Sequence, residues 1–142
     1  MIFTDPYGII DSMLNLFKIY SSFSVPDLEE AKNFYGNVLG LEISERPEGL
    51  DLKIADDTKV FIYLSAQNKP ADFTVLNLVV RNVEEEVDAL LKKDVSMEHY
   101  EMPGIKMDER GIMYNEREGM GPKVMAWFKD PAGNIIALSQ KS

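Results

Sequence analysis

Apolar and polar side chains alternate along residues 17–25, which is the pattern of a half-buried strand. One face holds Phe17, Ile19, Phe23 and Val25, and the other holds Lys18, Tyr20, Ser22 and Ser24. Asp27 then offers a helix N-cap with Glu30 three residues later, and apolar residues recur at spacings of three and four until Gly40. These signals predict a helix that covers the apolar face of the strand. Three more strands are expected at 41–45, 50–55 and 59–65.

The same order of signals occurs twice. Val25-Pro26-Asp27-Leu28-Glu29-Glu30 matches Val80-Arg81-Asn82-Val83-Glu84-Glu85 at an offset of 55 residues, so Asn82 takes the place of Asp27 as N-cap. A strand is expected before this second copy at 73–80, and others after its helix at 97–101, 123–129 and 135–139. We therefore expect one domain over 1–142, with an appendage at 1–15 and βαβββ units at 16–66 and 72–140.

The second unit is longer than the first by 21 residues, which fall in the stretch 102–122. Insertions of this length between strands are functional or mobile loops. Arg110 and Arg117 lie in this stretch and are candidates to meet a ligand carboxylate if the loop closes over a cavity. The alternative is a solvated loop with surface ion pairs.

The charge balance and the absence of cysteine exclude several functions. The chain has 142 residues and a formal net charge of −9, which opposes binding to nucleic-acid phosphates and to anionic membranes. It has no cysteine and therefore no disulfide and no thiolate site. Neither a signal peptide nor a long apolar run is evident, so the expected location is cytoplasmic.

The turn at Asp130-Pro131-Ala132-Gly133-Asn134 joins two predicted strands near the C-terminus. Together with the pattern V-x-D-L-E-x-A-x-x-F-Y-x-x-x-L-G-L over 25–41 and the tandem units, this turn resembles the vicinal oxygen chelate superfamily, which includes glyoxalase I, bleomycin-resistance proteins and extradiol dioxygenases. The resemblance implies an α+β fold in which tandem βαβββ units form a curled eight-stranded mixed sheet around a cavity, with the helices on the outer face. It also implies a homodimer that shares a cavity between two chains.

In metal-dependent members of this family, the resemblance places ligands on the first and last strand of each unit. The matching positions here are Tyr20, Val75, Ala137 and Phe61, or Tyr63 instead of Phe61 if the register differs by two residues. None of these side chains is an imidazole or a carboxylate, which divalent metals require in such sites. We therefore expect no metal and no cofactor.

The strand faces that the helices leave uncovered predict the lining of the cavity. The predicted ligand-binding residues are Tyr20, Ser22, Phe61, Tyr63, Val75, Asn77, Ala137 and Ser139. Such a lining suits a small apolar or aromatic molecule held by a few hydrogen bonds, and the alternative is that these side chains simply fill the barrel. His99 is the only histidine and is expected on an exposed edge, so no catalytic residue is assigned.

Three functions remain open at this point. The first is metal-independent binding and sequestration of a small molecule, as in bleomycin-resistance proteins. The second is a lyase or isomerase with an atypical site, in which Tyr20, Tyr63 or a loop carboxylate transfers the proton. The third is a structural partner domain whose cavity is filled.

Overall fold

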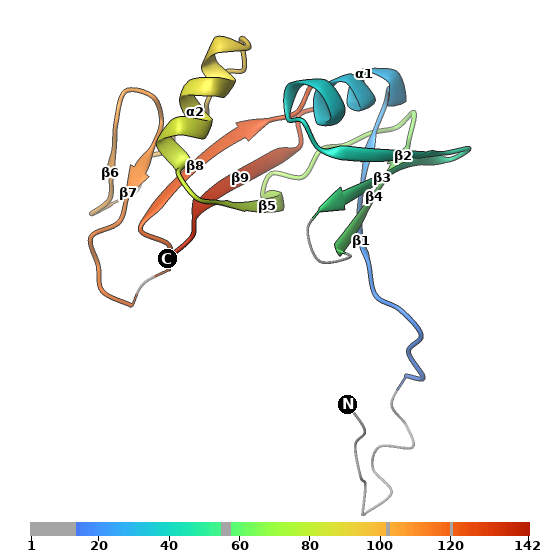
Figure 1. Ribbon diagram of the computed structural model, residues 1–142, viewed down its shortest axis with the longest axis horizontal. Coiled ribbons are helices and arrows are strands. Elements are labelled where there is room, and N and C mark those ends of the chain that lie inside the picture. Colours follow the sequence, from blue (N-terminus) through green and yellow to red (C-terminus); the bar gives the residue numbers. More distant parts are fainter. Residues whose placement is uncertain (1–13, 55–57, 102, 120) are drawn as a thin grey trace, which may run out of the picture.

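The computed structural model describes residues 14–54, 58–101, 103–119 and 121–142. The described part contains two helical segments and nine strands in two sheets, which confirms the α+β class (Figure 1). The sheets have four and five strands and are not closed into one eight-stranded sheet. Most of the predicted appendage at 1–15 lies outside the described residues. Among the described helices, none is long and apolar enough to cross a membrane.

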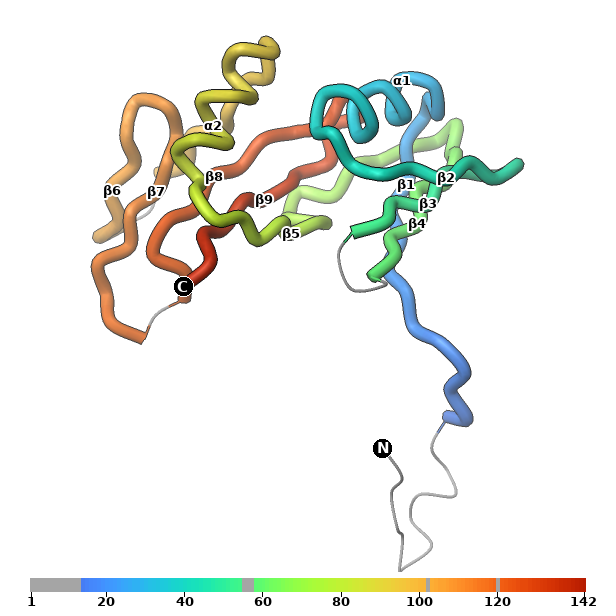
Figure 2. The backbone as a smooth tube through the Cα atoms, in the orientation of Figure 1, coloured from blue at the N-terminus to red at the C-terminus, as the bar shows by residue number. Residues whose placement is uncertain are grey.

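The first unit has the predicted order of strand, helix and three strands. Its elements are β1 (Ser21–Val25), α1 (Leu28–Lys32), η2 (Asn33–Val38), β2 (Glu42–Arg46), β3 (Gly49–Ile54) and β4 (Thr58–Leu64). The sheet order is β1-β4-β3-β2, with β1 parallel to β4 and the other pairs antiparallel. The first strand begins at Ser21, so Phe17 and Ile19 are exposed instead of lying under the helix. Residues 14–20 lead away from the body of the molecule (Figure 2).

The second unit departs from the prediction at one strand. Its elements are β5 (Thr74–Val80), α2 (Val83–Lys92), β6 (Lys106–Met107), β7 (Met113–Tyr114), β8 (Val124–Lys129) and β9 (Ile135–Gln140), in the sheet order β5-β9-β8-β7-β6. The strand predicted at 97–101 is wrong, because only Met97 bridges to Phe128. The insertion supplies β7 instead, which pairs with the other end of β8. The stretch 102–122 therefore contains a short hairpin that widens the sheet.

Both predicted N-caps are confirmed. Asp27 Oδ1 accepts from the Glu30 amide and Asn82 Oδ1 from the Glu85 amide, each at 3.0 Å. The two helices end at residues with positive φ, Gly40 at 73° and Asp94 at 62°. Gly40 lies thirteen positions after Asp27, but Asp94 lies only twelve positions after Asn82. The π-helical turn η2 accommodates this extra residue, in which Leu39 N bonds back to Phe34 O.

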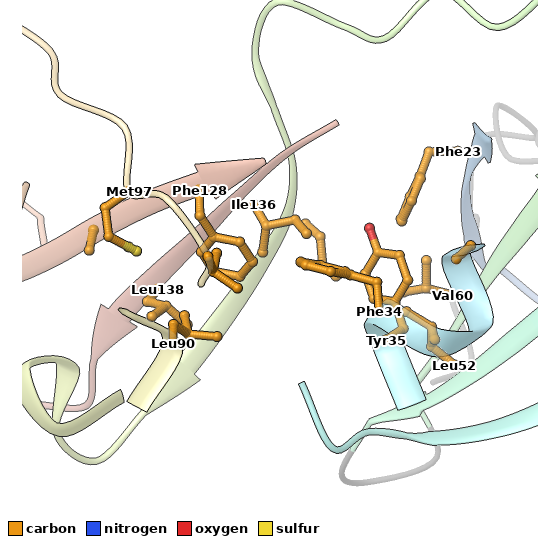
Figure 3. Close-up of a cluster of buried hydrophobic side chains, with 14 of the residues drawn as sticks. Phe23, Phe34, Tyr35, Leu52, Val60, Leu90, Met97, Phe128, Ile136 and Leu138 are labelled. Carbon is orange, nitrogen blue, oxygen red and sulfur yellow. The ribbon is translucent and has the colours of Figure 1, made fainter. Parts of the chain in front are cut away.

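One hydrophobic core joins the two units. Both helices lie on the same side of the sheets (Figure 1), and the buried side chains of both units form one cluster. Phe34 of the first unit points toward Phe128 of the second, whereas the Tyr35 ring lies beside Phe23 (Figure 3). The rings of Phe34 and Phe128 are 6.1 Å apart. The units therefore share apolar burial and do not fold around separate cores.

The predicted C-terminal turn forms the polar part of this joint. Tyr35 Oη donates to Asp130 Oδ2 at 2.7 Å, and this bond is buried. The Asn134 amide donates to Asp130 Oδ1 at 2.8 Å, and Asn134 Nδ2 donates to Asp130 Oδ2 at 3.0 Å and to the Ser24 carbonyl at 2.9 Å. Gly133 takes a φ of 94°, which favours glycine. The turn thus ties β8 and β9 to both α1–η2 and β1.

Replacing Tyr35 with phenylalanine should destabilise the joint. The substitution Tyr35→Phe removes a donor from a buried carboxylate, and we expect a loss of about 1–3 kcal/mol in the free energy of unfolding. Urea denaturation followed by circular dichroism measures this loss. Tyr63→Phe is the matched control, because the Tyr63 side chain is 41% exposed and its hydroxyl deletion should change little. Equal effects of the two substitutions would contradict the role of the joint.

The pH dependence offers a second readout of the same substitution. Burial, and then the neighbouring Asp130, raise the pKa of Tyr35 above its ordinary value. A phenol with a raised pKa in the folded state stabilises the protein below the pKa of the unfolded chain, about 10. This contribution is lost as the pH rises above that value. The alkaline decline in stability should therefore be smaller in Tyr35→Phe than in the wild type.

Candidate functional site

Three of the predicted lining residues of the first unit, Ser22, Phe61 and Tyr63, lie on the sheet face opposite the buried Phe23, Val60 and Ile62. Ser22 pairs with Phe61 in the register of β1 and β4, and the rings of Phe61 and Tyr63 stack with centroids 6.3 Å apart. Arg46 lies over the Phe61 ring at 4.8 Å. Tyr20 precedes β1 and is 60% exposed. The first unit therefore presents an aromatic surface with a cation beside it.

The predicted residues of the second unit form a matching but more covered group. Asn77 pairs with Ala137 in the register of β5 and β9, and Val75 falls at the irregularity in that pairing. Ala137 and Ser139 are buried, whereas Asn77 is exposed. Trp127 pairs with Ala137 across β8 and β9, and its ring contacts Tyr100 edge-on at 5.6 Å. Aromatic packing thus occupies part of this face.

The register settles which residue of the first unit corresponds to Ala137. Ser22 lies five residues before the N-cap Asp27, and Asn77 lies five before Asn82. Their strand partners are Phe61 and Ala137. Phe61 is therefore the equivalent position, and Tyr63 corresponds to Ser139.

These positions do not fit a divalent metal. Tyr20, Phe61, Val75 and Ala137 provide no imidazole and no carboxylate. Across the described ranges, no group of three or more His, Cys, Asp or Glu side chains could hold a metal ion. A metal site of the family type has no ligands here, and no step of the proposed function uses one.

A pocket of about 570 Å³ lies between the two units on the helix side of the sheets. The first unit provides the end of η2 and the end of β3, and the second provides β5 and one face of α2. The lining includes Leu39, Leu41, Ile54, Val79, Ala89 and Leu90. Of the eight residues predicted to line a cavity, only Asn77 lines this pocket. Its volume and its apolar walls are those of small-molecule sites.

This pocket is the counterpart of the joint at Asp130. Asp130 directly follows β8, and its amide donates to the Asn134 carbonyl across the turn. Ile54 ends β3 and pairs with Thr58 in the same way, so Ile54 and Asp130 hold equivalent positions. Tyr35 and Leu90 each lie eight residues after their N-caps. Where the first helix makes a buried hydrogen bond to Asp130, the second helix presents Leu90 near Ile54, in the lining of the pocket. The same junction is polar in one copy and apolar in the other.

The two junctions also differ in how much space they enclose. Around Val25, Ala31 and Pro131, the polar junction leaves no space for a water-sized sphere. An adjoining groove of about 330 Å³ is lined by charged residues, Lys93, Asp94, Glu98, Lys129 and Asp130 among others. Phe34 lines this groove seven residues after its N-cap, whereas Ala89 holds that place in the apolar pocket. A smaller side chain at this position enlarges the apolar pocket.

The lid candidate Arg110 is bound to α2. Its guanidinium contacts Asp108 at 3.0 Å, Asp88 at 3.1 Å and Glu84 at 3.7 Å. Tyr114 Oη donates to Glu84, and this bond raises the pKa of Tyr114 to about 12. Burial alone would raise the pKa of Asp108, but hydrogen bonds from the Ile112 amide and from Arg110 lower it. These contacts hold the hairpin of the insertion against the helix.

The other lid candidate lies farther along the insertion. Arg117 is exposed, and its guanidinium donates to the Pro103 carbonyl at 3.3 Å.

The histidine His99 was expected on an exposed edge. Its side chain is exposed, and its Nε2 atom lies 3.1 Å from the Glu109 carbonyl of the insertion. The insertion thus makes contacts within itself and with α2. The proposal that Arg110 or Arg117 meets a ligand stays a prediction.

Sequence reasoning missed the pocket between the units. It considered the sheet face that the helices leave uncovered, whereas this pocket lies on the covered side. The signal was present in the repeat, because aligning the last strands puts Ile54 where the second unit has Asp130. That difference marks a junction that cannot form the same hydrogen bonds.

Comparisons with known proteins support the fold and the family. The family model described as "Glyoxalase/Bleomycin resistance protein/Dioxygenase superfamily" matches residues 19–138. A search of curated proteins finds no match.

Three of the similar solved structures illustrate the range of the family. A superfamily member from Sphaerobacter thermophilus is 24% identical, with a TM-score of 0.60 over 90% of this chain and 100% of that one. TnmS3, an antibiotic-binding protein from Streptomyces sp. CB03234, is 23% identical, with a TM-score of 0.58 over 89% and 98%. A lactoylglutathione lyase from Agrobacterium tumefaciens is 16% identical, with a TM-score of 0.59 over 87% and 92%. At these identities the structures establish the fold alone. With its tandem units and its matched family model, the chain belongs to the glyoxalase/bleomycin resistance protein/dioxygenase superfamily.

Proposed function

We propose that this protein binds and sequesters a small, largely apolar or aromatic molecule without a metal. The observation that supports this most directly is the apolar pocket of about 570 Å³ between the units. A preformed pocket of this size can bury most of a drug-sized ligand, with apolar burial as the main favourable term. The neighbour TnmS3 has the same fold and is described as an antibiotic-binding protein.

The binding does not depend on a metal ion. The positions that correspond to the family's metal ligands carry Tyr20, Phe61, Val75 and Ala137. Elemental analysis of protein purified without chelator should therefore find no stoichiometric nickel, zinc, manganese or iron. Dialysis against a chelator should leave ligand binding unchanged. A stoichiometric metal whose removal abolishes binding would overturn this part of the proposal.

Filling the pocket should abolish binding. Ala89→Phe places a ring where the equivalent helix position carries Phe34, whereas Ala89→Ser keeps the side chain small. A panel of aromatic and amide-bearing compounds, screened by thermal shift and by ¹H–¹⁵N NMR spectra, identifies a ligand for the wild type. We expect Ala89→Phe to weaken its binding at least tenfold and Ala89→Ser to leave it nearly unchanged.

One further variant, compared with Ala89→Phe, tests the location of the site. Tyr63→Ala removes an aromatic ring from the opposite sheet face and should not affect binding in the pocket. If Tyr63→Ala weakened binding and Ala89→Phe did not, the ligand would lie on the predicted sheet face. If no compound in the panel bound, sequestration would lose its support. Turnover of a methylglyoxal–thiol adduct would favour the alternative of a lyase or isomerase.

The proposal includes a homodimer, in which the predicted sheet face of one chain is completed by a second. Residues 14–20 support it, because Phe17 is 101% and Ile19 is 79% exposed and large apolar side chains on an extended arm suit an interface. Multi-angle light scattering should give the mass of a dimer. The double substitution Phe17→Glu and Ile19→Glu should produce monomers, while Lys18→Glu on the same arm should not. A wild-type protein that is monomeric at micromolar concentration would contradict this arrangement.

A further inference from the structure

Strand β5 has a free edge that runs along the apolar pocket. It is the terminal strand of its sheet and pairs only with β9 among the described strands. Four consecutive residues of β5, 77–80, line the pocket. The pocket therefore follows a strip of main chain as well as apolar side chains.

The register identifies which main-chain groups face the pocket side. The Val80 carbonyl accepts from the Lys141 amide at 2.8 Å, so the polar groups of Val80 point toward β9. Along a strand, successive residues direct their N–H and C=O groups to opposite edges. Regular pairing from Leu76 to Val80 then turns the N–H and C=O groups of Asn77 and Val79 to the free edge.

In the first unit, a side chain from the polar junction hydrogen-bonds to the main chain at the equivalent strand edge. Ser24, which lies three residues before its N-cap as Val79 does, offers its carbonyl to Asn134 Nδ2 at 2.9 Å. The position equivalent to Asn134 carries Thr58 in the first unit, which has no amide to extend to β5. The free edge at Asn77 and Val79 thus has no side-chain amide matching the one that binds Ser24.

The pocket lining contains two charged side chains, Lys93 and Glu86. The main-chain groups of β5 are its most regularly spaced polar groups. Lys93 Nζ already donates to the Val38 carbonyl at 2.8 Å, and Glu86 is exposed at the rim on α2. A ligand in the pocket meets apolar walls, which include Leu41 and Ala89, and, at the β5 side, a donor and acceptor spaced as in a strand. Strand addition recognises a partner through this combination.

We propose that the pocket selects small apolar molecules that carry secondary amides in an extended, peptide-like arrangement and hydrogen-bond to Asn77 and Val79 of β5. The inference rests on the proposed binding function and names the ligand class for that site. The apolar groups of the ligand lie against Leu39, Leu41 and Ile54, and its amide N–H and C=O groups continue the sheet beyond β5.

A matched pair of probes tests this directly. N-acetyl-leucyl-leucine N′-methylamide carries extended secondary amides, and its fully N-methylated twin lacks the N–H donors but is more apolar. Titrations of the full chain followed by NMR should show saturable binding of the first, with Ala89→Phe abolishing it. The twin should bind about tenfold more weakly or worse, the effect of losing one net hydrogen bond or more.

Amide hydrogen exchange gives a residue-level readout in the same samples. The amides of Asn77 and Val79 should exchange rapidly in the free protein and slow at least tenfold with the blocked dipeptide. Those of Leu78 and Val80, which face β9, serve as internal controls. Val79→Pro removes one edge donor and should weaken binding about tenfold, whereas Val79→Ala keeps the donor and should not.

The possible outcomes separate the inference from the function on which it rests. If both probes bind equally in a way that Ala89→Phe blocks, the pocket binds apolar molecules and the strand-addition inference is overturned. If neither probe binds, and no compound of the wider panel binds, both proposals fail. If Asn77 and Val79 are already protected in the free protein in a concentration-dependent way, a second copy covers the edge and the inference is wrong.

Discussion

The buried carboxylate of Asp130 holds the two units together. Its oxygens accept three hydrogen bonds, from the Tyr35 hydroxyl of the first unit and from the main-chain and side-chain nitrogens of Asn134 in its own turn. A buried carboxylate is costly unless its oxygens are satisfied. The turn must therefore keep its shape and the first helix must stay in place. The ring contact of Phe34 with Phe128 and the shared core then follow from the same arrangement.

The same constraint explains why, among the described residues, the apolar pocket lies at one junction and the other junction is polar. A tandem repeat would build this junction twice, but Ile54 and Leu90 replace Asp130 and Tyr35 in the second position. Apolar side chains give no directional bond that would hold the end of β3, at Ile54, against β5. The junction stays open, its walls are apolar, and the edge of β5 lies along it. A difference of a few side chains between two copies thus converts a structural joint into a candidate binding site.

Different interactions hold the insertion of the second unit in place. Its hairpin adds β7 and β6 to the sheet, beside the place where Met97 makes a single bridge. Arg110 then connects the hairpin to α2 through Asp88 and Glu84. These ion pairs are partly exposed and so are each worth little on their own, but together they orient the hairpin. This network accounts for the charged middle of the insertion without requiring a ligand.

The sequence by itself determined the local elements and their repetition. Asp27 and Asn82 specify the helix starts, Gly40 the end of the first helix, and Asp130 to Asn134 the final turn, because capping and turn formation depend on residues close in the chain. Alternation assigned most strands to their faces for the same reason. The lack of imidazole or carboxylate at four family positions could also be read directly from the residues.

The tertiary structure decided what depends on residues far apart in the chain. Only the register decided between Phe61 and Tyr63 as the counterpart of Ala137. Only the structure showed that β7 replaces a strand expected at 97–101 and that η2 takes up an extra residue. The pocket also required it, since its walls come from η2, β3, β5 and α2. Each of these elements has an apolar face because that face is buried in the core of its own unit. Which of their surfaces meet, and which leave a space, is set by the packing of the two units, and no local pattern encodes that.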